Sequence, residues 1–111
     1  LFPYTTLFRS LIYTREQFSR ESEASISKII PYRNSVSINL SLPNHNNLEY
    51  VEIFINLNRD TLFSEKIQNP AQNIQIQVPK MNLKKMATIQ LFTKEKNNKK
   101  VKEAPQKKMK L

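Results

Sequence analysis

Few side chains of this sequence have a type and spacing that could do chemistry. His45 is the only histidine and stands among asparagines, so no second histidine is near it in sequence to complete a metal site or a proton relay. Glu49 and Glu52 lie in a strand-like stretch at a spacing that puts them on opposite faces, which excludes a paired acid and base. Cysteine and glycine are both absent, which excludes thiolate metal ligands and a glycine-rich phosphate loop. We therefore predict no catalytic residue, no metal site and no cofactor, and thus no enzyme.

The lysines are the next candidates, because they could contact anions. Residues 94–111 hold eight lysines and two glutamates, a net charge of +6, whereas residues 11–93 have a net charge of only +2. Pro105 and the scarcity of apolar residues predict a disordered basic tail over residues 105–111. Lysine binds phosphate without sequence preference, so nucleic acid or another anionic surface is a candidate partner. The candidate anion-contacting residues are Lys99, Lys100, Lys102, Lys107, Lys108 and Lys110.

The patterns in the rest of the chain predict a series of β-strands. In residues 36–42 aliphatic side chains alternate with serine and asparagine, the period-two pattern of a strand with one buried face. No helix-period segment of crossover length separates the strands, which argues against a parallel α/β sheet. The patterns predict strands over residues 24–30, 36–42, 48–55, 61–67, 72–78, 87–93 and 101–104.

Three aromatic side chains gather in this arrangement. If Val51 and Ile53 face the core, then Tyr50 and Phe54 point outward, and Phe92 does the same on the strand over 87–93. If the two strands are neighbours in one sheet, these side chains form a contiguous exposed apolar surface of the kind that marks an interface, so Tyr50, Phe54 and Phe92 form a candidate protein interface. The alternative is that residues 11–18, or a segment upstream of them, cover the same face.

The strand series between residues 24 and 104 resembles immunoglobulin-like β-sandwich domains in general. The approach to the penultimate strand, P-x-x-N-L-x-x-x-A-x-I-x-L from Pro79 to Leu91, is part of that resemblance, while the cysteine pair, the tryptophan and the corner tyrosine of antibody domains are missing. The resemblance implies an antiparallel sandwich in which residues 36–42 and 50–55 face each other across the core. It also implies that the strands over 48–55 and 87–93 are neighbours in one sheet, which gathers the three aromatic side chains on one face. The break at 43–48 also fits a direct pairing of these strands, which would give a small barrel or a meander instead.

The first ten residues, LFPYTTLFRS, resemble the in-frame translation of a sequencing-library adapter, and we exclude them from the fold. Residues 11–23 are then a linker or the remnant of an upstream element, 24–104 the sandwich domain and 105–111 the basic tail. No run of eighteen apolar residues is present to span a membrane.

Three functions remain open from the sequence. The first is a non-catalytic sandwich module, structural or protein-binding, from the C-terminal part of a longer protein, with an extracytoplasmic location suggested by the fold class. The second is a small basic protein that binds nucleic acid through its lysine-rich tail. The third is an accessory domain of an enzyme whose catalytic part is missing.

Overall fold

The computed structural model describes residues 23–111. The expectations for residues 1–10 and for most of 11–23 lie outside the described residues. Within them the chain forms eight strands and one short 3-10 turn, η1 (His45–Asn47). The strands are β1 (Ser25–Pro31), β2 (Ser35–Ser41), β3 (Leu48–Leu57), β4 (Asp60–Gln68), β5 (Asn73–Pro79), β6 (Met86–Glu95), β7 (Val101–Glu103) and β8 (Lys107–Lys110).

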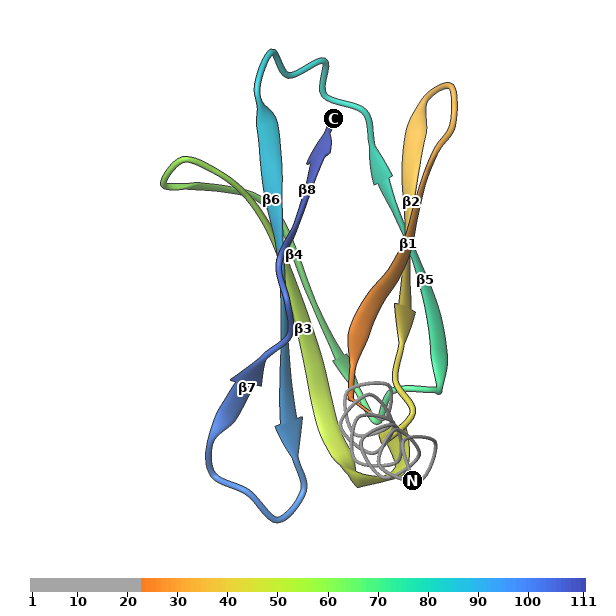
Figure 1. Cartoon of the computed structure of the whole chain (residues 1–111), viewed down its shortest axis with the longest axis vertical. Helices are drawn as coiled ribbons and strands as arrows, with labels where there is room; N and C mark the ends of the chain where they lie inside the picture. Colours follow the sequence, from red (N-terminus) through yellow and green to blue (C-terminus); the bar gives the residue numbers. More distant parts are fainter. Residues whose placement is uncertain (1–22) are drawn as a thin grey trace, which may run out of the picture.

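Two antiparallel sheets lie against each other as layers (Figure 1). The small sheet has the order β1-β2-β5, and the large sheet has the order β4-β3-β6, followed by β7 and β8 along the outer side of β6. Both sheets have free edges, so the structure is not a closed barrel. Because β2 and β3 belong to different sheets, η1 carries the chain across the core, and the barrel and meander alternatives are wrong.

Aliphatic side chains from the inner faces of both sheets form one core. Alternation places every second residue of β3 and β6 inward, and these positions are almost completely buried. Met81 and Leu83 of the β5–β6 loop are partly buried and pack against this core. The buried aliphatic positions are Ile26, Val36, Ile38, Leu40, Leu42, Leu48, Val51, Ile53, Ile55, Ile76, Val78, Ile89 and Leu91.

The prediction of a disordered tail over residues 105–111 is wrong. Lys107–Lys110 forms β8 and pairs with β6, and Met109 and Leu111 are only 5% and 4% exposed. These two residues alternate with lysines, so a lysine-rich segment still carries one apolar face. The Leu111 carbonyl oxygen also accepts hydrogen bonds from the N–H groups of Met81 and Leu83, at 3.0 and 3.1 Å.

A bulge explains how the chain passes Pro105 without leaving the sheet. Glu103 lies opposite Phe92 and Lys107 lies opposite Ile89, so three residues between them face two residues of β6. The extra residue bends the edge strand, and proline is tolerated there because its missing N–H breaks no ladder bond. The Ala104 N–H still donates to the Leu91 carbonyl oxygen at 2.8 Å.

Asparagine takes the backbone positions that glycine would normally hold. The non-glycine residues with positive φ in the described chain are Asn58, Asn69 and Asn82, at 57°, 48° and 52°. Asparagine tolerates this left-handed region better than other side chains do. Asn97 and Asn98 also form a turn, in which the Asn98 N–H donates to the Glu95 carbonyl oxygen, but neither of these two residues adopts positive φ.

Candidate protein-binding face

The three predicted aromatic residues lie on the outer face of the large sheet. Tyr50 and Phe54 of β3 alternate with buried residues, and Phe92 lies on the neighbouring strand β6. All three side chains are half-buried. The rings of Phe54 and Phe92 meet edge to face, with centroids 5.7 Å apart and an interplanar angle of 77°. Such a pair contributes about 0.5–1.5 kcal/mol beyond its buried area, so it fixes two rings at the middle of the face.

Tyr50 has a different neighbour. The Nζ atom of Lys66 on β4 lies 4.0 Å from the centroid of the Tyr50 ring, which is a cation–π contact. Lys66 also lies directly opposite Glu52 in the pairing of β3 with β4. The part of the face near the start of β3 therefore combines an aromatic ring with a cation and a carboxylate, and the sequence alone did not identify Lys66 or Glu52 as part of it.

A chain of polar side chains crosses the face beside the aromatic pair. Thr61 Oγ1 donates to Asn56 Oδ1 at 2.9 Å, and Asn56 Nδ2 donates to Gln90 Oε1 at 2.6 Å. Gln90 Nε2 and Gln106 Nε2 both donate to Glu103 Oε1, at 3.1 and 2.7 Å. These bonds connect β4, β3, β6 and β7 and hold each amide in one orientation. The alternation puts Asn56 and Gln90 on the outer face, but only the strand register shows that they meet.

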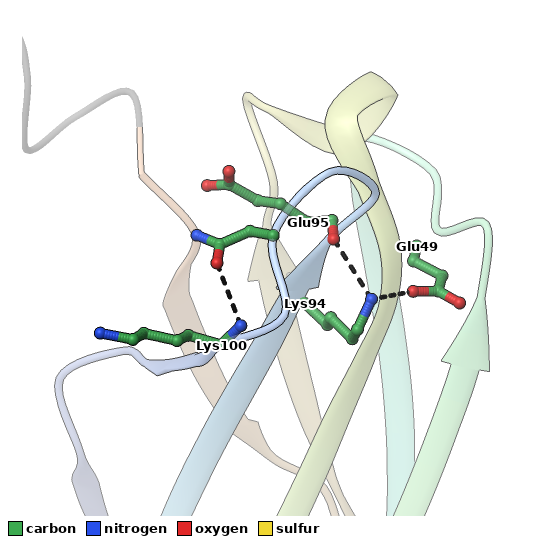
Figure 2. A network of polar contacts seen from close by, with 5 residues as sticks. Glu49, Lys94, Glu95 and Lys100 are labelled. Atoms are coloured by element: carbon green, nitrogen blue, oxygen red, sulfur yellow. Dashed lines mark hydrogen bonds and ion pairs between the residues drawn. The ribbon is translucent and has the colours of Figure 1, made fainter.

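An ion pair closes the face at the end near the β6–β7 turn. Lys94 Nζ bonds to the Glu49 carboxylate and lies 3.4 Å from the Glu95 carbonyl oxygen (Figure 2). The hydrogen bond and the charge of Lys94 lower the pKa of Glu49 below its usual value. In the same turn the Lys100 N–H donates to Asn98 Oδ1 at 3.0 Å. Lys94 is therefore held in place beside the aromatic face, with 24% of its side chain exposed.

The six predicted anion-contacting lysines do not share one mobile segment. Lys102 pairs with Glu95 at 3.1 Å, and Lys107 lies opposite the core residue Ile89 in register. Charged residues along an edge strand, especially ones that point inward, discourage pairing with another chain. Lys99 and Lys100 lie in the β6–β7 turn, Lys102 lies in β7, and Lys107, Lys108 and Lys110 lie in β8, all of them exposed.

Glu49 and Glu52, predicted on opposite faces, both lie at the outer face of the large sheet, because the register shift between Leu48 and Tyr50 changes the side to which Glu49 points. Each carboxylate lies beside a lysine there, Glu49 beside Lys94 and Glu52 beside Lys66, and His45 lies apart from this face. His45 is half-buried in η1, and its Nδ1 atom has no hydrogen-bond partner among the described residues. Within residues 23–111 no group of three or more histidine, cysteine or acidic side chains is placed to hold a metal ion. The same part of the chain contains no helix of the length and hydrophobicity that a membrane crossing requires.

One polar cavity opens between the start of β1 and β7. Its volume is about 230 Å³, below the range of about 300–1,000 Å³ that is usual for small-molecule sites, and a wider depression of about 480 Å³ lies beside Lys80, Leu83 and Lys110. The ion pair of Lys102 with Glu95 occupies part of the wall of the smaller cavity, beside Glu23 and Glu103. The outer face of the large sheet is therefore the more extended candidate surface. Comparison of the chain with family models, with curated proteins and with solved structures finds no match.

Proposed function

We propose that this chain is a non-catalytic β-sandwich module of the immunoglobulin-like class, used as a structural or protein-binding unit. The outer face of the large sheet, around Tyr50, Phe54 and Phe92, is its contact surface. The observation that carries the proposal is the placement of three half-exposed aromatic side chains on a face whose polar groups are already fixed by hydrogen bonds. Aromatic anchors surrounded by polar groups are typical of protein interfaces.

The strand order supports the choice of class. In immunoglobulin-like domains the first, second and fifth strands share one sheet, and the third, sixth and seventh share the other. The orders β1-β2-β5 and β3-β6-β7 agree with that arrangement. The fourth strand of an antibody constant domain pairs with the fifth, whereas β4 pairs with β3 here. This departure widens the large sheet and places Lys66 beside the aromatic residues.

Lysine footprinting tests whether the face is covered in the protein's natural setting. An amine-acylating reagent would be applied to the purified chain at low micromolar concentration and to the protein in its own cells. We expect Lys66 to react several-fold more slowly in cells, because a partner covers it, while the exposed Lys28 on β1 of the small sheet reacts at the same rate in both. Equal rates for Lys66 in the two settings would contradict the proposal.

A second candidate function is anion binding along the β8 edge. Lys80 and Lys110 line one depression at the end of the sandwich, which places two cations together. A salt titration of RNA or DNA binding tests it, using a variant in which Lys107, Lys108 and Lys110 are replaced by glutamine. Binding that weakens with salt and with these substitutions would support an electrostatic site, and binding that neither salt nor the substitutions change would remove it.

A further inference from the structure

The charges on the outer face of the large sheet follow a pattern across the strands. One row of directly paired residues crosses the four strands of this sheet. It runs from Lys66 on β4 through Glu52 on β3 and Phe92 on β6 to Glu103 on β7. The row therefore carries a cation at one margin and an anion at the other, with the aromatic pair near its middle. Side chains at directly paired positions share one face of a sheet, so the four lie in line.

From this pattern we propose that a second copy of the chain covers the face. The inference rests on the proposed function, because it takes the same surface and names its partner. In the dimer a twofold axis runs parallel to the strands between β3 and β6, and it places β4 of one chain over β7 of the other. Lys66 of each chain then meets Glu103 of its partner. In a twofold interface both chains use the same surface, so each contact between unlike residues occurs twice. A cation at one end of the row and an anion at the other end therefore give two ion pairs, one at each edge of the interface.

The neighbouring row fits the same axis. This row runs from Gln68 on β4 through Tyr50 on β3 and Lys94 on β6 to Val101 on β7. The axis brings Tyr50 over Lys94 of the other chain, which adds a cation–π contact, and brings Gln68 over Val101. Val101 is 47% exposed, one of the few large apolar side chains that the described residues leave so open to solvent.

The Glu103 carboxylate is oriented by two hydrogen bonds in a way that fits such a contact. Its two recorded hydrogen bonds, from Gln90 and Gln106, both end on Oε1. Within the described residues Oε2 has no recorded partner, so it is open to a lysine from another chain. The two amides also hold the carboxylate in one orientation, which lowers the side-chain entropy that is lost when the ion pair forms.

The face is large enough for a weak specific dimer. The ten-residue strands β3 and β6 are about 33 Å long, β4 is one residue shorter, and β7 and β8 together flank β6. Four strand positions side by side are about 19 Å wide, which gives roughly 600 Å² per chain. Both partners together bury about 1,200 Å², the lower limit of stable interfaces. Interfaces of this class range down to micromolar affinity, so we expect a dimer that dissociates on dilution.

Sedimentation equilibrium of the full chain over a range of concentrations tests the inference. We expect a concentration-dependent monomer–dimer equilibrium, and we expect Lys66→Glu and Glu103→Lys each to weaken it by about tenfold or more, because each places like charges opposite each other at both margins. An equimolar mixture of the two variants restores the dimer, since every new glutamate then faces a new lysine. Lys28→Glu, an exposed substitution on β1 of the small sheet, leaves the equilibrium unchanged.

Several results would overturn the inference. A wild-type chain that stays monomeric at high concentration, single variants that dimerise like the wild type, or a mixture that fails to recover would each do so. Circular dichroism of each variant shows that a loss of dimer is not a loss of fold. If the wild type is monomeric but Lys66 is still protected in cells, the second copy is wrong and the proposed function stands. If Lys66 is unprotected in both settings, the proposed function fails as well.

Discussion

The substitution Met109→Ala tests whether the lysine-rich end is an integral part of the sandwich. Met109 is 5% exposed and lies opposite Ala87 of β6, so the substitution removes most of a buried side chain from the core. Replacement of a buried methionine by alanine costs about 2–5 kcal/mol, and an edge strand relaxes more easily than a central one, so we expect about 2 kcal/mol. For a domain of this size that loss lowers the melting temperature by about 10 °C.

The matched control is Lys108→Ala on the same strand. Lys108 is exposed and lies opposite Thr88, so its removal changes the free energy of unfolding by about 0.5 kcal/mol or less. Urea denaturation followed by circular dichroism gives both values, and a low protein concentration keeps self-association out of the measurement. If Met109→Ala has no larger effect than Lys108→Ala, then β8 does not contribute to the core in solution and our account of this segment is refuted.

Three further predictions concern the turns and the face. Asn82→Ala is expected to lower the free energy of unfolding by about 1–2 kcal/mol because alanine is strained at positive φ, whereas Asn82→Gly has little effect in the same urea experiment; equal effects would contradict this explanation. The Glu49 carboxyl should titrate below its usual pKa in an NMR titration, and Lys94→Gln should return it to the usual value. Because the folded-state pKa is the lower one, this ion pair stabilises the fold above the unfolded pKa, and the contribution is lost as the pH falls through the folded pKa. A double-mutant cycle with Phe54→Ala and Phe92→Ala should give a coupling of about 0.5–1.5 kcal/mol, and additive effects would show that the ring contact contributes nothing.

The strands and the outward aromatic side chains could be predicted from alternation alone. A strand with one buried face has aliphatic side chains at every second position, so the alternation in β2, β3 and β6 indicates which residues point inward. Once Ile53 and Leu91 are placed in the core, Phe54 and Phe92 have to face outward. The neighbourhood of β3 and β6 came from the resemblance, and the pairing in the structure agrees with it.

Other features depend on interactions between segments that are distant in sequence. The break before β3 fits a hairpin as well as a crossing, because its length is compatible with both. The polar chain from Thr61 to Gln106 exists only because the register brings Asn56 opposite β6 at the position where Gln90 can reach it. The last strand was missed because Pro105 and the lysines outweighed the short alternation of Met109 and Leu111, and the tertiary contact with β6 determines its conformation.

The crossing at η1 has a consequence for the way the chain folds. The pairing of β2 with β5 encloses β3 and β4 in a chain loop, and the pairing of β3 with β6 encloses β4 and β5, so the two loops overlap in sequence. Each sheet therefore needs a non-local pairing across strands of the other sheet, and only the β1–β2, β3–β4 and β6–β7 hairpins are local in sequence. We therefore expect a single cooperative transition with a folding time of milliseconds to seconds, as for other domains that depend on non-local strand pairing.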